Sequence, residues 1–322
     1  MQTRARRATL AGGAGRSVLA AASDALLPFF STREAAQSLR GVCREFAGAV
    51  ARHAWDDRET VIKGSIAAWR ASFPRAKAAN VTKFQYAFAH RTISVVDADF
   101  VYFEGLQFLD MNVCRQVTDA AFVHLNGIRE LSMHSCDQMA ITDAAFANLK
   151  GIHTLTMNCC NQATITDAAF ANLKGIHTLS MGDCDQATIT DAAFANLKGI
   201  HTLDMSRCSQ ATITDAAFAN LKGIHTLSMW GCNQDTITDA AFANLKGIHT
   251  LHMNNCNQAT ITDAAFIHLG GIHTLRIAYC KQATITGATF SHLVGADIVY
   301  MTGCSAATIA AARVLKMRVF AF

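Results

Sequence analysis

A string of fifteen residues, ITDAAFANLKGIHTL, occurs five times without change and constrains the fold more than any other feature of the chain. The copies begin every 24 residues, at Ile141, Ile165, Ile189, Ile213 and Ile237. Weaker copies begin at Val95, Val117 and Ile285. A fixed period of this length indicates a solenoid, because one unit cannot bury its own apolar face whereas stacked units can.

Each unit predicts a short strand followed by a short helix. In the segment HTLTM, Leu155 and Met157 alternate to one face, as expected for a strand. Thr166 or Asp167 then caps a helix, and Gly175 is placed to end it in the left-handed conformation. The helix phenylalanines should form a continuous buried spine: Phe100, Phe122, Phe146, Phe170, Phe194, Phe218, Phe242, Phe266 and Phe290. We expect a right-handed α/β solenoid with a parallel sheet on its concave side and helices on its convex side.

The spacing within the unit also resembles a known repeat family. Ile152, Leu155, Met157 and Cys160 follow an L-x-x-L-x-L-x-x-C pattern, and the motif ITD opens each helix. This combination resembles the cysteine-containing leucine-rich repeat, over roughly Asp97 to Cys304. The resemblance implies a leucine-rich repeat horseshoe, with about nine repeats of 24 residues in the range 81–304.

Cysteine usage and charge narrow the environment and the partners. Eight of the eleven cysteines recur every 24 residues, from Cys136 to Cys304, and are not clustered as metal ligands would be. We interpret them as buried small apolar residues of a protein in a reducing compartment, the cytoplasm or nucleus. A net charge of +4 is small for 322 residues, and no stretch approaches 18 apolar residues. We therefore expect no metal, no cofactor, no nucleic-acid partner and no membrane segment.

Differences between the copies gather in and just after the strand, whereas the helix surface stays constant through the five identical strings. These positions alternate with the inward Leu and Met, so their side chains should face the concave side of the sheet. The alternative is recent duplication with a few random changes. We favour a binding face for a protein partner, centred on Asp204, Arg207, Trp230, His252, Asn254, Arg276, Tyr279 and Tyr300, because aromatic and arginine side chains often anchor interfaces.

Two polar residues recur in every central unit. Histidines stand at the strand entry, at His153, His177, His201, His225, His249 and His273. A row of imidazoles can bind metal or sense pH, but we interpret this row as a repeated polar rim. Glutamines such as Gln162 and Gln186 should bond along the stack or satisfy turn backbone. Neither row forms an irregular cluster of nucleophile, base and orienting group, so we predict that the protein is not an enzyme.

The segment before the repeats has a different composition. Residues 1–16 read as a flexible tail, and residues 17–80 are alanine-rich and helical. The stretch LLPFFSTREAAQSLRGVCREFAGAVARHAW resembles an F-box, with its apolar opening, its Val-Cys-Arg-aromatic group and its later Trp55. The opening helix of that family is not recognisable at Ser17–Asp24. The resemblance implies docking onto a Skp-type adaptor through Leu26, Leu27, Pro28, Leu39, Val42, Cys43 and Phe46.

These expectations combine into a function. The first hypothesis is a non-catalytic substrate-recognition subunit of a cullin-type (SCF-like) ubiquitin ligase, in which the small all-α N-terminal domain binds the adaptor and the repeats bind the protein substrate. The alternative is a stand-alone leucine-rich repeat interaction scaffold, whose N-terminal helices only cap the array. Residues 305–322 read as a C-terminal cap made of one helix and part of a strand.

Overall fold

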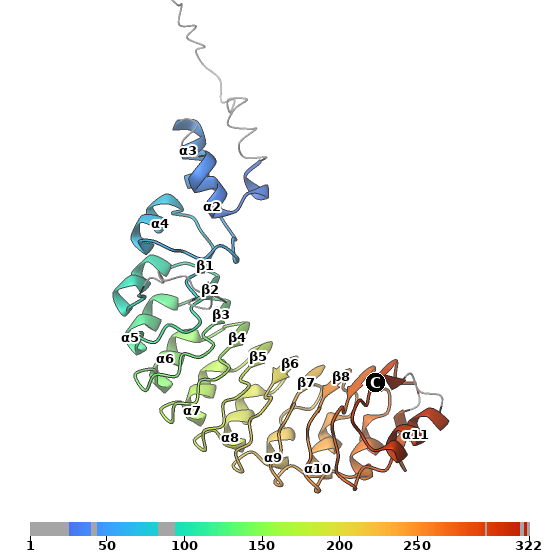
Figure 1. Ribbon diagram of the computed structural model, residues 1–322. Coiled ribbons are helices and arrows are strands. Elements are labelled where there is room, and N and C mark those ends of the chain that lie inside the picture. Colours follow the sequence, from blue (N-terminus) through green and yellow to red (C-terminus); the bar gives the residue numbers. More distant parts are fainter. Residues whose placement is uncertain (1–25, 40–43, 83–93, 294, 316–318, 321–322) are drawn as a thin grey trace, which may run out of the picture.

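The computed structural model describes residues 26–39, 44–82, 94–293, 295–315 and 319–320. The described residues form a curved array in which strands line the inner side of the arc and short helices line the outer side (Figure 1). The predicted tail, residues 1–16, lies outside the described residues.

One parallel sheet of eleven strands runs through the array in sequence order. Neighbouring strands pair with a shift of one repeat, so that Thr154 lies opposite Thr178 and Leu155 opposite Leu179. The strands are β1 (Ala78–Asn80), β2 (Phe108–Asp110), β3 (Glu130–Ser132), β4 (Thr154–Thr156), β5 (Thr178–Ser180), β6 (Thr202–Asp204), β7 (Thr226–Ser228), β8 (Thr250–His252), β9 (Thr274–Arg276), β10 (Ile298–Tyr300) and β11 (Val319–Phe320). This sheet confirms the predicted solenoid with its concave sheet and convex helices.

The convex side is built from single turns of α-helix, most of them continued by a 3-10 turn. The α-helical turns are α5 (Asp119–Phe122), α6 (Asp143–Phe146), α7 (Asp167–Phe170), α8 (Asp191–Phe194), α9 (Asp215–Phe218) and α10 (Asp239–Phe242). The 3-10 turns are η3 (Asp97–Phe103), η4 (Val123–Leu125), η5 (Ala147–Leu149), η6 (Ala171–Leu173), η7 (Ala195–Leu197), η8 (Ala243–Leu245), η9 (Asp263–Leu269) and η10 (Phe290–Leu293).

Short-range rules place each turn as the sequence predicts. Thr166 caps α7, and its hydroxyl accepts a hydrogen bond from the Ala168 amide. Gly175 follows the 3-10 turn with a φ of 86°, in the left-handed region where glycine carries no Cβ penalty. Phe170 and its eight equivalents, from Phe100 to Phe290, are completely buried and make the predicted spine.

Each repeat is also hydrogen-bonded to the next through side chains. The two oxygens of Asp143 accept from the amide and the hydroxyl of Thr166, both at 2.7 Å. The Cys160 thiol donates to the Met133 carbonyl at 3.2 Å. The Gln162 amide donates to the Cys136 carbonyl at 3.0 Å, which confirms that this glutamine satisfies turn backbone of the preceding repeat. The aspartate and cysteine bonds repeat along the array as continuous ladders. The glutamine ladder runs from Gln138 to Gln234, whereas the side-chain nitrogens of Gln258 and Gln282 have no partner among the residues that the structure describes.

The N-terminal helices pack on the first end of the array. They are η1 (Leu27–Phe29), α2 (Thr32–Glu34), η2 (Ala35–Leu39), α3 (Arg44–Arg52) and α4 (Ile66–Ser72). Trp55 is buried between them, with its indole nitrogen donating to the Val50 carbonyl at 2.8 Å and its ring edge-on to Phe73. Trp55, Leu27 and Phe73 belong to the same continuous apolar core as the repeats.

The sheet extends beyond the predicted repeat range at both ends. Strand β1 lies within residues 17–80 and pairs with β2, and β11 lies within residues 305–322 and pairs with β10. Helix α11 (Ala306–Val314) lies between β10 and β11, as expected for a C-terminal cap. Within the described ranges, no helix combines the length and hydropathy needed to cross a bilayer.

Candidate functional site

Two rows of side chains follow the C-terminal half of the concave sheet. The strand row consists of the residues between the inward Leu and Met positions: Asp204, Ser228, His252, Arg276 and Tyr300. The edge row consists of the residues just after the Met position: Ser206, Trp230, Asn254, Ala278 and Thr302. Parallel in-register pairing brings the members of each row side by side, because equivalent residues of adjacent strands lie about 4.8 Å apart.

A stacked aromatic group ends the strand row. The Arg276 guanidinium lies 4.6 Å from the centre of the Tyr300 ring. Tyr300 in turn stacks on Phe320 of β11, with ring centres 5.1 Å apart. Phe320 is an exposed large hydrophobic residue, and it extends the row by one rung. Sequence reasoning missed Phe320 as a concave residue because no 24-residue copy covers it.

A second cation–aromatic pair lies closer to the middle of the arc. Arg207 stands 4.2 Å above the Trp230 ring, and its guanidinium is 3.6 Å from the Asp183 carboxylate. Arg207 has a φ of 57°, so it lies in a left-handed turn just after the strand rather than in the strand itself. The predicted anchors Arg207 and Trp230 are thus brought together, and each holds the other in a defined orientation.

The electrostatics of the strand row change sign along its length. Burial lowers the pKa of His252, and the neighbouring Arg276 charge lowers it further, against a smaller opposing effect of Asp204. His252 is therefore favoured in its neutral form at neutral pH. The Arg276 Nε atom is buried without a hydrogen-bond partner. The row runs from a carboxylate at Asp204 to a cation at Arg276, with a neutral imidazole between them.

Other predicted site residues also serve the scaffold. Asn254 accepts a hydrogen bond from the Ala278 amide at 2.8 Å, so its carbonyl oxygen is engaged by the next repeat. Asp204 accepts from the Ser206 amide at 3.0 Å. Tyr279 is 46% exposed and lies against Gly303, where an added Cβ would stand 2.4 Å from the ring. Tyr279 is therefore the most open aromatic of the predicted set, and Gly303 provides the flat surface under it.

The thiols of the array are poor nucleophiles. Burial raises the pKa of Cys136, Cys184 and Cys280 to about 12 each, so these groups stay protonated at neutral pH. Cys159 is half-buried on the concave side, and partial burial followed by the Asp183 charge raises its pKa as well. In the described part of the chain, no group of three or more His, Cys, Asp or Glu residues is arranged to hold a metal ion.

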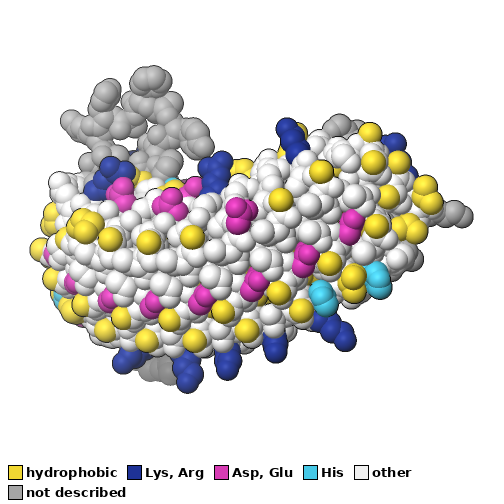
Figure 2. Space-filling view, turned by 90° about the horizontal axis from the view of Figure 1, so that it is seen from below, with side chains coloured by type: hydrophobic (Ala, Val, Ile, Leu, Met, Phe, Trp, Pro, Cys, Tyr) yellow, Lys and Arg dark blue, Asp and Glu magenta, His cyan; other side chains and the backbone are white. Residues whose placement is uncertain are grey.

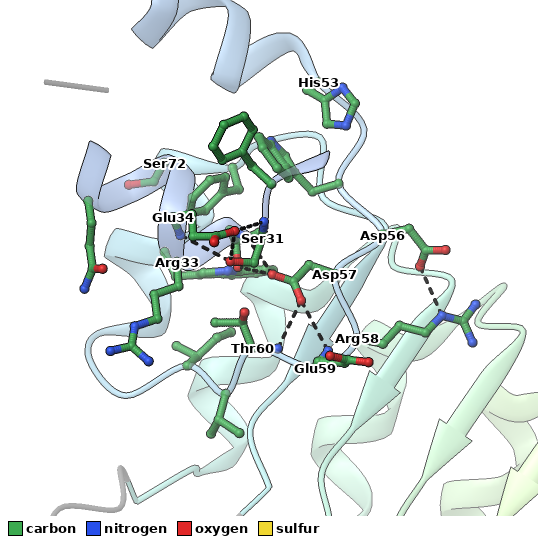
Figure 3. A pocket seen from close by; sticks show the side chains of 18 of the residues that line it. Ser31, Arg33, Glu34, His53, Asp56, Asp57, Arg58, Glu59, Thr60 and Ser72 are labelled. Atoms are coloured by element: carbon green, nitrogen blue, oxygen red, sulfur yellow. Dashed lines mark hydrogen bonds and ion pairs between the residues drawn. The ribbon is translucent and has the colours of Figure 1, made fainter. Parts of the chain in front are cut away.

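A pocket of about 1510 Å³ lies among the N-terminal helices and the loop before α4, and its lining residues fall between Leu27 and Phe73 (Figure 3). Asp57 is its polar centre: one oxygen accepts from the Thr32 amide and hydroxyl at 2.6 and 2.7 Å, and the other accepts from the Thr60 amide at 3.0 Å. Burial raises the pKa of Asp57, but the bonds from Thr60 and Thr32 outweigh it and lower the pKa overall. Ser31 and Glu34 close a capping box beside it.

Arg58 ties the loop at this pocket to the sheet. Its guanidinium is 2.5 Å from the Glu130 carboxylate of β3 and lies 4.6 Å from the centre of the Phe108 ring of β2. Asp57 therefore fixes the loop to α2, and Arg58 fixes it to the concave face. The polar groups of this region therefore help to hold the cap on the array.

The predicted adaptor residues have different environments. Leu27 is buried under the cap, whereas Leu26 is 47% exposed and Pro28 is also exposed. Phe46 on α3 is half-buried. Val42 and Cys43 lie outside the described residues, and Leu39 is described only as the last backbone position of η2.

Comparison with known families identifies the repeat type. The family model described as the BspA-type leucine-rich repeat region matches in six copies, over residues 100–225 and 163–294. This match covers most of the predicted repeat range. No curated protein matches the chain.

Solved structures share the fold at low sequence identity. A chain of the TLR13–ssRNA13 complex aligns over 83% of this chain with a TM-score of 0.58 and 16% identity. A chain of the Drosophila Toll–Spätzle complex aligns over 77% of this chain with a TM-score of 0.55 and 10% identity. The Leptospira interrogans protein LIC12759 aligns over 66% of this chain with a TM-score of 0.55 and 14% identity. The alignments span 38%, 39% and 53% of those chains, and at these identities they establish the fold alone.

Proposed function

The chain belongs to the BspA-type leucine-rich repeat family, and we propose that it is a non-catalytic binding scaffold that holds a protein partner on its concave face. The observation that carries the proposal is the confinement of sequence differences to the concave rows. The core, the turns and the convex helices repeat almost unchanged, while the concave rows change from repeat to repeat. In this reading the N-terminal helices act as the cap that a repeat array requires.

The contacts of the concave side support a partner that is gripped towards the C-terminal end. Two stacked pairs, Arg207 on Trp230 and Arg276 on Tyr300, hold large side chains in fixed orientations before any partner binds. Preorganised aromatic and arginine side chains are typical anchors, because little rotamer entropy is lost when they enter an interface. Tyr279 adds an exposed ring beside them.

The test is capture of partners by the purified full chain. The variant carrying Trp230→Ala, Arg276→Ala and Tyr279→Ala should lose its protein partners in a pull-down read by mass spectrometry. The matched control carries Ala171→Lys, Ala195→Lys and Ala243→Lys, which alter three exposed positions of the convex turns. Equal loss in the control, or full capture by the concave variant at unchanged thermal stability, contradicts the proposal.

A second candidate function is substrate recognition within a cullin-type ubiquitin ligase. The observation that favours it is the exposure of Leu26 and Pro28 at the start of the cap, where the F-box resemblance expects adaptor contacts. The buried environment of Leu27 and Trp55 favours the simpler capping role instead.

Direct binding to a purified Skp-type adaptor distinguishes the two candidates. The ligase reading expects a complex on size-exclusion chromatography that Leu26→Asp with Pro28→Ser disrupts, while Arg58→Gln at the other side of the pocket leaves it intact. If no complex with the adaptor forms at micromolar concentration, the ligase hypothesis is wrong and the scaffold hypothesis is unaffected.

A further inference from the structure

A file of stacked imidazoles runs along one flank of the array, where the helices end and the strands begin. His153, His177, His201, His225, His249 and His273 stack with ring centres 4.3 to 4.6 Å apart and interplanar angles of 11 to 14°. Their backbones are linked as well, since each histidine amide donates to the carbonyl of the preceding rung. The same backbone row contains Lys77 and Arg129 before the first histidine and Asp297 after the last.

A row of lysines runs beside this file. Lys150, Lys174, Lys198, Lys222 and Lys246 end the convex turns, and each stands three residues before a histidine. Figure 2 shows Lys and Arg side chains in a row along one edge of the convex face, with Asp and Glu side chains set away from that edge. The helix carboxylates, such as Asp167, are engaged by the next threonine at 2.7 Å. We name Lys77, Arg129, the six histidines and the five lysines the basic flank.

Each histidine of the file has one ring nitrogen engaged and one left over. The Nδ1 atom lies 3.1 to 3.2 Å from the hydroxyl of the next threonine, as for His201 and Thr202. A threonine hydroxyl can accept a hydrogen bond from Nδ1–H, so this contact persists when the ring is protonated. Among the described residues, only the last rung has a partner on Nε2: His273 meets the Asp297 carboxylate at 2.5 Å. The Asp297 carboxylate therefore shows that an anionic oxygen can bind a histidine of the file through Nε2.

We propose that the basic flank binds a linear polymer that carries phosphate or sulfate groups and no nucleic-acid bases. The flank should bind this polymer more tightly as the pH falls. Protonated imidazoles at this spacing repel one another, and a line of anionic groups along the file relieves that repulsion. Binding is therefore coupled to proton uptake, and the lysine row supplies attraction that does not depend on pH in this range.

The charged groups around the file have defined effects. Arg129 and the lysine row place positive charges beside the file, and Asp297 places a carboxylate at its last rung. Glu130 follows Arg129 in sequence, but its carboxylate is held by Arg58 at 2.5 Å. Dehydration by the adjacent rings lowers the pKa of His201, and the charges of His225 and His177 lower it further. His201, in the middle of the file, is therefore favoured in its neutral form until an anion is bound beside it.

The geometry disfavours two other ligands. A zinc site needs three or four ligands that converge, whereas the free Nε2 atoms of parallel rings point in parallel. Nucleic acid bases stack on exposed aromatic faces, but the inner rings of this file have both faces covered by their neighbours. A polymer that carries charge without bases fits what the flank offers.

The experiment measures binding of fluorescein-labelled polyphosphate and dextran sulfate to the full chain by anisotropy, at pH 7.5, 6.5 and 5.5 and constant salt. We expect affinity to rise by about tenfold per pH unit, the change for uptake of one net proton on binding. The two probes separate a phosphate source from a sulfate source. A single-stranded oligo-dT of equal charge is the third probe, and binding as tight as that of the other two overturns the proposal.

Three variants locate the site. One variant carries His177→Gln, His201→Gln and His225→Gln together, which introduce the residue found at Gln107 of the same row, and should clearly weaken the pH dependence. Lys174→Asn, Lys198→Asn and Lys222→Asn use the residue found at Asn126, and should weaken binding at every pH. The control, Lys281→Asn, removes an exposed cation elsewhere and should change nothing. Binding that is independent of pH in the parent chain, or an undiminished pH dependence in the histidine variant at unchanged thermal stability, overturns the proposal.

Discussion

In each 24-residue unit, the residues of the core and of the convex turns form the core side, and the residues of the two concave rows form the concave side. The two sides differ in which partners their side chains contact. On the core side, Asp143 and Cys160 each bond to a neighbouring repeat in the way that their copies do, and Gln162 does so in the way of its copies up to Gln234. On the concave side, Arg207 stacks on Trp230 and Arg276 on Tyr300, and these pairings do not recur from repeat to repeat. The core side is thus determined by the repeat, and the concave side by individual neighbours.

This difference shows which positions are free to acquire function. A change at Asp143 breaks a contact that both adjacent repeats use, so its cost is the same in every copy. A change at Trp230 alters one local pair and leaves the ladder intact. Repeat arrays gain stability from nearest-neighbour interfaces, so binding residues can vary only where those interfaces do not need them. The following experiments test this comparison in order of expected effect.

Alkaline pH should destabilise the core side most strongly. Unfolded cysteines lose their protons near pH 9, whereas burial raises the pKa of thiols such as Cys184 to about 12 in the native state. Above pH 9 the folded state therefore holds more protons than the unfolded state, and stability falls as pH rises. Each such thiol contributes about 1.4 kcal/mol per pH unit in this window. Urea unfolding from pH 8 to 10.5 under reducing conditions measures the slope, which Cys208→Ala should lower by one proton.

An unchanged slope in Cys208→Ala would show that its thiol does not hold the proton that burial implies. The matched control is Cys159→Ala, because Cys159 is only half-buried on the concave side. Its removal should leave a steeper alkaline dependence than removal of Cys208.

Truncation of one phenylalanine of the spine should cause the next largest loss of unfolding free energy. Phe194→Ala should cost about 3 to 5 kcal/mol of unfolding free energy, because Phe194 is fully buried in the continuous apolar core and its removal leaves a cavity. Urea unfolding followed by circular dichroism measures it. Ala195→Ser, at the adjacent exposed position, should stay within about 0.5 kcal/mol. A loss under 1 kcal/mol for Phe194→Ala would contradict a continuous spine.

Removing one inter-repeat carboxylate should have an intermediate effect. Asp191 accepts from the amide and the hydroxyl of Thr214, both at 2.7 Å. Asp191→Ala should therefore cost about 1.5 to 3 kcal/mol, the range for hydrogen bonds to a charged group. Asp185→Ala is the control, since its exposed carboxylate is not part of the ladder. Equal losses in the two variants would show that the ladder contributes little.

The sequence predicted the core side almost completely. Thr166 as cap, Gly175 as left-handed turn, Phe170 as core and Gln162 as turn partner all follow from short-range rules, and the repeat applies each rule many times. The resemblance to the cysteine-containing subclass identified leucine-rich repeats, and the family that matches is the BspA type.

Contacts that occur only once in the array could not be predicted from the repeat pattern. The bond between Asp57 and Thr32 joins residues 25 apart with no copy elsewhere, so nothing in the sequence marks it. Arg207 and Trp230 were both predicted as concave residues, but their stacking also involves the left-handed backbone at Arg207, which the repeat pattern does not reveal. Periodicity gives the face of a residue, whereas its partner depends on the rotamers of particular neighbours.

The smallest effect on stability should come from the concave side, and it is the sharpest test of the comparison. Trp230→Ala removes a half-buried ring whose main described partner is the Arg207 guanidinium at 4.2 Å. A cation–π pair at a partly exposed site contributes about 0.5 to 1 kcal/mol, so the unfolding free energy should fall by no more than about that amount. Urea unfolding of Trp230→Ala beside Phe194→Ala gives the ratio directly. If the two losses were equal, Trp230 would be part of the structural core. Residues of the concave side would then be required for stability and could not vary independently for binding.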